Sequence, residues 1–146
     1  MEKTEIVLND DILTTKDAVS TTFFIKHGDF CFPDSQWTDL TSSVFGMWAY
    51  RLKNLPEGTT RLFFMDGPYR LDVFKDGENL KIDCVCFRSG NKTEHSFECS
   101  FRDFKEAFCG ALEKFCRILY LNDMNKGENK PIYAQMQMLL KEFKNL

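Results

Sequence analysis

Short apolar runs separated by polar residues open the chain, and the spacing of the apolar residues then changes. The runs at 6–8 and 23–25 predict β-strands. From Ser35 onward the apolar residues recur every three or four positions, as they do on one face of a helix. This face contains Trp37, Leu40, Val44, Trp48 and Leu52. The pattern predicts a helix of about five turns, with Asp34 or Ser35 as its N-cap and its end before Pro56.

Four strand-like runs follow, at 59–66, 69–75, 80–88 and 92–101. The segments between them contain Gly together with Asp, Asn or Pro, which are the residues of tight turns. We therefore expect an antiparallel four-strand meander. Asp66 lies in the first of these turns, where a catalytic carboxylate is the alternative interpretation. The turn is favoured, because the neighbouring Pro68 has no N–H to donate and belongs at the end of a strand.

Alternation along these runs assigns the side chains to two faces of the meander. The inward face is expected to hold Tyr69, Leu71, Val73, Leu80, Ile82, Cys84, Cys86, Thr93, His95, Phe97, Cys99 and Phe101. The outward face is expected to hold Arg70, Asp72, Phe74, Lys81, Asp83, Val85, Phe87, Lys92, Glu94, Ser96, Glu98 and Ser100. The stretch 61–65 is apolar on both faces, which predicts an inner strand of the sheet.

Two helices are predicted after the meander. Residues 100–103 read Ser-Phe-Arg-Asp, a capping-box pattern in which Asp replaces the usual Glu, and they begin the longer helix. Its apolar stripe is Phe101, Phe104, Phe108, Leu112, Phe115 and Leu119. The polar segment 122–131 separates it from a terminal helix with a weaker stripe, which is Ile132, Met136, Leu139, Leu140 and Phe143. We expect one α+β domain over 1–146, with the four-strand meander and the N-terminal strands in an antiparallel sheet and the helices packed on one face.

Composition and charge narrow the classes of function. The net charge of −3 and the pI near 5.4 leave no basic footprint for nucleic acid. No apolar run approaches the roughly 20 residues that span a bilayer, and the first residues do not form a signal peptide, so we expect no membrane partner. The six cysteines form no CxxC or Cys/His cluster. This usage predicts reduced thiols in a cytoplasmic protein, with neither metal site nor cofactor.

Residues that could carry catalysis are few. His95 falls on the inward face of its strand, where it could meet Cys84 across adjacent strands. A thiolate beside an imidazolium would be a nucleophile, but a satisfied core histidine is the favoured interpretation. The sequence contains no nucleophile elbow, zinc-protease motif or Gly-rich phosphate-binding pattern. We therefore expect a protein that is not an enzyme, and a small enzyme with a Cys or carboxylate site is the alternative.

The outward face of the meander is the candidate binding surface. Its apolar centre is Phe74, Val85 and Phe87. Its rim is Asp72, Asp83, Glu94 and Glu98. An apolar patch rimmed by carboxylates suits a protein partner. Alternatively, the N-terminal segment or a second copy of the chain covers this face, and the copy would make the protein a homodimer.

A resemblance bears on the identity of the partner. It is carried by Phe32, Pro33, Trp37 and Asp39 together with Phe64, Met65, Asp66, Gly67, Pro68 and Tyr69. This pattern resembles small bacterial immunity proteins of polymorphic and contact-dependent toxin systems. The resemblance implies a cytoplasmic protein that binds a cognate toxin domain and occludes it without catalysis. It consists of a helix start and a hairpin turn over residues 32–69, so it implies a fold more firmly than an activity and carries over no binding residue. A homodimeric adaptor domain is a further alternative.

Overall fold

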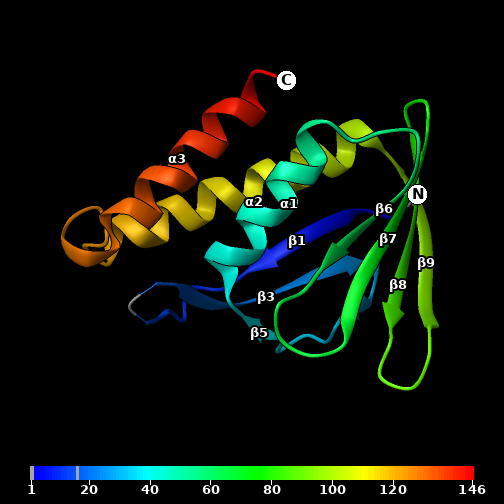
Figure 1. Cartoon of the computed structure of the whole chain (residues 1–146), viewed down its shortest axis with the longest axis horizontal. Coiled ribbons are helices and arrows are strands. Elements are labelled where there is room, and N and C mark those ends of the chain that lie inside the picture. The colour runs from blue at the N-terminus through cyan, green and yellow to red at the C-terminus, as the bar shows by residue number, and fades with distance from the viewer. Residues whose placement is uncertain (1, 16) are drawn as a thin grey trace.

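The computed structural model describes residues 2–15 and 17–146, which form two antiparallel sheets and three α-helices (Figure 1). The N-terminal strands are β1 (Thr4–Leu8), β2 (Leu13–Thr14), β3 (Val19–His27), β4 (Phe30–Phe32) and β5 (Thr38–Asp39). The other elements are α1 (Thr41–Lys53), β6 (Gly58–Phe63), β7 (Tyr69–Asp76), β8 (Asn79–Cys86), β9 (Lys92–Ser100), α2 (Phe101–Leu121), a short 3-10 helix (Gly127–Asn129) and α3 (Lys130–Lys144). The α+β class, the four-strand meander and the N-terminal strands are as predicted.

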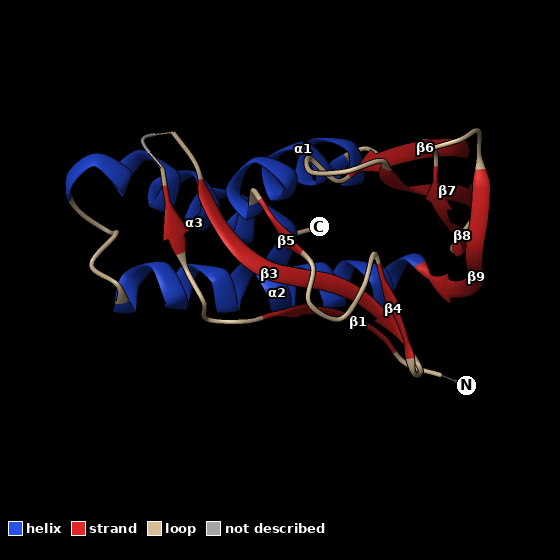
Figure 2. Cartoon of the chain, turned by 90° about the horizontal axis from the view of Figure 1, so that it is seen from below, coloured by secondary structure: helices blue, strands red, loops and turns tan. Residues whose placement is uncertain are grey.

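The first sheet is built around β3, which pairs antiparallel with β1, β2, β4 and β5. The two predicted strands at 6–8 and 23–25 lie in β1 and β3. Apolar residues of β3 point into the core, where the Phe23 ring packs against the rings of Phe45 and Trp48 of α1 at 5.2 and 6.1 Å between centroids. The helices lie on one side of this sheet, and the four-stranded sheet stands across its end (Figure 2).

Helix α1 begins at Thr41, so the prediction of a helix from Ser35 is wrong. Residues 38–39 pair with β3 instead, and the backbone N–H of Phe23 donates to the carbonyl of Trp37 at 2.9 Å. The predicted caps are wrong as well, because the N-cap position is Leu40, without a side-chain hydrogen bond. The Asp34 carboxylate accepts the Gln36 N–H at 2.8 Å in a local turn. Trp37 has the spacing of a helical apolar residue, but it packs against the core from an extended segment before α1.

The second sheet is the predicted meander, in the order β6-β7-β8-β9. Its inward residues Leu71, Val73, Leu80, Ile82 and Cys84 are buried, which confirms the face assignment through the centre of the sheet. Strand β6 lies at the edge, so the prediction of an inner strand for 61–65 is wrong. One face of β6 is apolar because α1 packs beside it, and the indole N–H of Trp48 donates to the Phe63 carbonyl at 2.8 Å. The other face is apolar because the Phe63 ring packs against Phe87 on the outer side of the sheet.

An irregularity in β9 changes the predicted faces at its start. The register shifts between Cys84 and Val85, which leaves Glu94 without a partner on β8 and pairs Thr93 with Val85. This is a β-bulge, in which one strand contributes an extra residue. Thr93 therefore lies in the row of Val85, on the outward face, and the prediction that it faces inward is wrong. Phe101, also assigned to the inward face of this strand, is the first residue of α2.

Helix α2 starts as its capping pattern predicts, with the Ser100 hydroxyl accepting the Asp103 N–H at 2.9 Å. The stripe of α2 is buried apart from the half-buried Phe101, and the helix lies along β1 and against α3. Met136 and Phe143 of α3 are fully buried, and the Phe143 ring packs on Phe108 at 5.2 Å. The helices thereby close the core and leave the far side of the four-stranded sheet free of other described elements (Figure 2).

Candidate protein-binding face

The outer face is the side of β6–β9 that points away from the helices, and its side chains lie in three cross-strand rows. The first row is Thr59, Phe74, Lys81 and Glu98. The second row is Arg61, Asp72, Asp83 and Ser96. The third row is Phe63, Arg70, Val85 and Thr93. Five of the seven residues predicted for a binding site lie in these rows, while Phe87 follows β8 and Glu94 is at the bulge.

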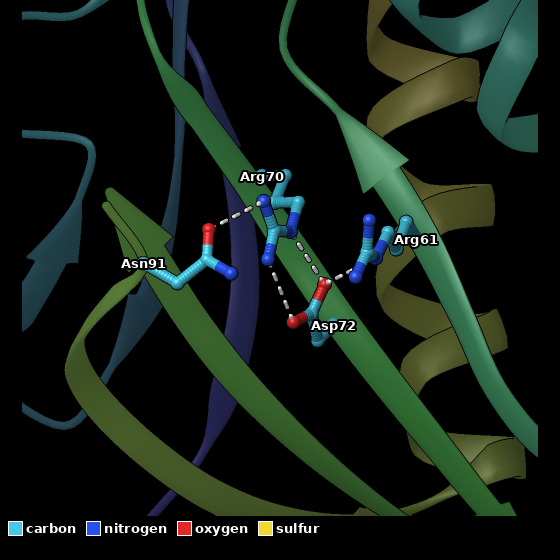
Figure 3. A network of polar contacts seen from close by, with 4 residues as sticks. All are labelled: Arg61, Arg70, Asp72 and Asn91. Atoms are coloured by element: carbon cyan, nitrogen blue, oxygen red, sulfur yellow. Dashed lines mark hydrogen bonds and ion pairs between the residues drawn. The ribbon is translucent and has the colours of Figure 1, made fainter. Parts of the chain in front are cut away.

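A charged network fixes the centre of this face (Figure 3). The Arg70 guanidinium donates from Nε to Asp72 Oδ1 at 2.8 Å, from Nη2 to Asp72 Oδ2 at 3.3 Å and from Nη1 to Asn91 Oδ1 at 3.3 Å. Arg61 approaches the same carboxylate at 3.8 Å. Arg70 is only 5% exposed and lies 5.4 Å from the centroid of the Phe87 ring, a cation–π distance. The planar guanidinium is held in one orientation by contacts on three sides.

The apolar part of the face differs from the predicted patch. Phe74 is 48% exposed, as expected for a contact residue, whereas Val85 is 2% exposed and so cannot present a surface. Phe87 is half-buried because Arg70 covers its ring and Phe63 packs against it at 5.9 Å. Phe63 is itself 37% exposed, and sequence reasoning missed it by placing its strand inside the sheet. The accessible aromatic side chains are therefore Phe63 and Phe74, on either side of the Arg70–Asp72 pair.

The carboxylates form a mixed rim rather than a uniformly acidic one. Asp72 is bound by Arg70 and Arg61. Asp83 accepts a hydrogen bond from the Ser96 hydroxyl at 2.6 Å. Glu98 lies opposite Lys81 on the neighbouring strand, while Glu94 is exposed at the bulge. Arg61 and Lys81 thus stand in the same rows as the predicted acidic residues. The prediction of an acidic rim did not take these cations into account.

Cys84 and His95 are cross-strand neighbours, as predicted, but their surroundings do not make them a reactive pair. Burial raises the pKa of the Cys84 thiol to about 12, so the thiol is neutral at physiological pH. His95 Nε2 lies 3.1 Å from His27 Nδ1, and the His95 ring stacks on Phe30 at 4.2 Å. Burial, and then the neighbouring His27, lower the pKa of His95, while Glu2 acts in the opposite direction. This arrangement offers no thiolate–imidazolium pair.

Most of the residues that carry the resemblance lie around the buried Asp39 carboxylate, and we call this region the Asp39 junction. The Asp39 carboxylate accepts the Trp37 indole N–H at 3.0 Å and the backbone N–H groups of Leu40, Met65 and Asp66 at 2.7, 3.2 and 3.1 Å. Burial raises the pKa of Asp39, and the bonds from Trp37, Leu40 and Asp66 offset part of that effect. The carboxylate thereby joins the start of α1 to the β6–β7 turn.

Aromatic rings pack around the Asp39 junction. Trp37 packs edge-on against Tyr69 at 5.1 Å, and Phe32 packs edge-on against Phe64 at 5.8 Å. Gly67 has φ +74°, and a Cβ there would come within 2.7 Å of the Trp37 ring, so only glycine fits. The buried and half-buried residues of the motif hold the fold together, while Met65, Asp66 and Gly67 remain exposed at the turn.

Comparison with protein-family models, with curated proteins and with solved structures found no match. Within residues 2–15 and 17–146 no group of three or more His, Cys, Asp or Glu is arranged to hold a metal ion. Each of the six cysteines lies in the described part of the chain and is a free thiol. None of the described helices is both long enough and apolar enough to cross a bilayer.

Proposed function

We propose that the chain binds another protein through the outer face of β6–β9. The observation that carries this proposal is the pairing of two accessible aromatic rings, Phe63 and Phe74, with the fixed Arg70–Asp72 pair on a sheet face free of other described elements. Aromatic and arginine side chains are enriched in protein–protein interfaces, above all among the residues that contribute most of the binding energy. Because Arg70 and Asp72 already satisfy each other, a partner does not need to order them on binding, and less entropy is lost.

The size of the face suits a partner that also contacts the neighbouring turns. With strands about 4.8 Å apart and about 3.4 Å per residue, six residues on each of four strands cover roughly 400 Å². A standard interface buries about 800 Å² on each partner. Asn91, which accepts a hydrogen bond from Arg70, joins the β8–β9 turn to this face, and Met65 is exposed in the β6–β7 turn at the end of these strands. A globular domain resting on the sheet and both turns would reach the usual size.

The partner that we propose is a toxin domain, and the role of the chain is that of a cytoplasmic immunity protein. The resemblance over residues 32–69 supports this identity, and the rigid, preformed face supports binding by occlusion. In this mechanism the sheet covers the active cleft of the toxin and excludes its substrate, without any chemical step. The carboxylates of Glu94 and Glu98 at the edge of the face would speed association with a basic cleft.

Co-expression tests this function. The chain is produced together with a domain that is encoded beside it and that arrests growth when produced alone, and bacterial growth is measured. Wild-type chain is expected to restore growth, and Phe74→Asp is expected to abolish the rescue because it places a charge in the centre of the contact. Tyr50→Asp is the matched control, since Tyr50 is 81% exposed on α1, away from this face, and should rescue like the wild type. Failure of the wild-type chain to restore growth would refute the immunity function.

A further inference from the structure

A cleft of about 490 Å³ opens on another side of the molecule, where the two sheets part. One wall is formed by residues 2–6 in and before β1, and the other by Glu98 and Cys99 at the end of β9. The floor comes from α2, where Ala107, Gly110 and Ala111 present small side chains. A Cβ at Gly110 would meet nothing within 4 Å, so there is room above the floor. The outer face of the meander takes no part in this cleft apart from Glu98.

At the β1 edge, which faces this cleft, alternate backbone groups bond to none of the described residues. The carbonyl of Lys3 accepts the Gly28 N–H at 3.3 Å, and the Asn9 N–H donates to Thr22 at 2.9 Å, so the odd-numbered residues of this segment pair with β3. In an antiparallel ladder alternate residues bond to opposite sides. The N–H and C=O groups of Thr4 and Ile6 therefore point away from β3. Both residues line the cleft.

The β9 edge follows the same rule. The Phe101 N–H donates to the Glu78 carbonyl at 2.8 Å, which places the odd-numbered residues at the end of β9 in the ladder with β8. The backbone groups of Glu98 consequently point to the open side. Among the other edges, β6 is bonded at its end by the Trp48 indole N–H, which donates to the Phe63 carbonyl, and β2, β4 and β5 are only two or three residues long. Short or covered edges are a usual protection against strand addition, and β1 lacks it.

The charge of the cleft is strongly one-sided. Its lining includes one ammonium group, Lys3, and five carboxylates, which are Glu2, Glu5, Glu98, Asp103 and Glu106. Only Glu5 is within ion-pair distance of Lys3, at 3.6 Å. Glu106 binds Arg102 at 3.2 Å, and both side chains are exposed, so the negative potential over α2 is only partly offset. Glu2 lies 3.6 Å from His27, and the lining as a whole still holds more carboxylates than cations, which favours cationic side chains in the cleft.

We propose that this cleft binds an extended, lysine- or arginine-bearing segment of a partner protein by strand addition to β1. The free backbone groups of Thr4 and Ile6 would pair with the backbone of the segment, which is the source of affinity in this mode of recognition. The carboxylates would select basic side chains, and the small residues of α2 would accept the side chains that point to the floor. This surface is separate from the toxin-binding function proposed above and does not depend on it.

Two peptides and three variants test the proposal by fluorescence anisotropy. The probe is a labelled hexapeptide of alternating lysine and valine, and the control peptide alternates glutamate and valine. Thr4→Pro removes an N–H that faces the cleft without breaking the ladder to β3, at the first strand position, where proline is tolerated. Glu106→Lys reverses a charge on the exposed surface of α2, and Glu128→Lys makes the same change outside the cleft.

The lysine peptide is expected to bind the wild type at low ionic strength, with the Thr4 and Ile6 amide resonances shifting in NMR spectra. Thr4→Pro should weaken binding at least tenfold and Glu106→Lys about fivefold, while Glu128→Lys should leave it unchanged. Equal binding of the two peptides, or no binding of the lysine peptide, would overturn the proposal. So would an unchanged affinity in Glu106→Lys, a variant that leaves the fold intact. None of these outcomes depends on rescue by the outer face, so the two proposals fail separately.

Discussion

Replacing Asp39 should remove the hydrogen bonds that join the start of α1 to the β6–β7 turn. Four N–H groups converge on this buried carboxylate, two of them from Met65 and Asp66 on the far side of the junction. Hydrogen bonds to a charged group contribute about 1.5–3 kcal/mol each when one partner is removed. Burial of the carboxylate opposes part of that gain, so we expect Asp39→Ala to lower the free energy of unfolding by about 3–4 kcal/mol rather than by the full sum.

The assay is urea unfolding followed by tryptophan fluorescence and circular dichroism. Asp39→Asn keeps one acceptor oxygen and should cost about half as much as Asp39→Ala. Asp34→Ala is the matched control, because the exposed Asp34 carboxylate accepts a single N–H from Gln36 and its loss should cost under about 1 kcal/mol. In Asp39→Ala the amides of Met65 and Asp66 should also exchange hydrogen faster. A loss below about 1 kcal/mol for Asp39→Ala, with both amides still protected, would refute the role of this junction.

Three further outcomes follow from the structure. The pKa of His95 is lowered in the folded protein, so below the ordinary histidine pKa of 6.5 the unfolded state binds a proton more readily than the folded state. Stability should therefore fall as the pH falls below 6.5. In His95→Gln the urea midpoint should change less with pH. All six thiols should react with a thiol reagent in the unfolded protein without reductant, and recovery of two or fewer would contradict their reduced state. Phe108→Ala should lower the free energy of unfolding by roughly 3–5 kcal/mol, because its ring is fully buried against Phe45 and Phe143; a change under about 1 kcal/mol in denaturant titration would contradict that packing.

Sequence patterns predicted those elements whose side chains repeat with the period of the backbone. The meander could be assigned to faces because alternation follows strand geometry, and α2 because its apolar stripe and the Ser100 cap agree. The start of α1 was not predictable in this way. Trp37 has the spacing of a helical core residue but packs on Tyr69 from an extended segment, and only the tertiary contacts of Asp39 show this.

The candidate face was predictable as a surface but not in its composition. Alternation correctly placed Asp72, Phe74 and Asp83 on one side of the sheet. It could not show that Arg70 folds over Phe87, because that contact depends on rotamers. Nor could it show that Phe63 stands beside Phe87, because the pairing of β6 at the sheet edge is a property of the whole fold. Of the predicted apolar centre only Phe74 remains accessible, and Phe63 takes the place of the buried Val85 and the half-buried Phe87.

The central claim is that the outer face of β6–β9 binds the toxin domain, and the dissociation rate of that complex tests it most directly. The growth-arresting domain of the co-expression experiment is passed over immobilised wild-type chain, Phe74→Asp and Tyr50→Asp, and binding is followed by surface plasmon resonance. We expect Phe74→Asp to speed dissociation at least a hundredfold while Tyr50→Asp stays within twofold of the wild type, since losses of buried contacts appear mainly in the dissociation rate. Wild-type dissociation from both Phe74→Asp and Phe63→Asp, with their folds intact by circular dichroism, would contradict the claim.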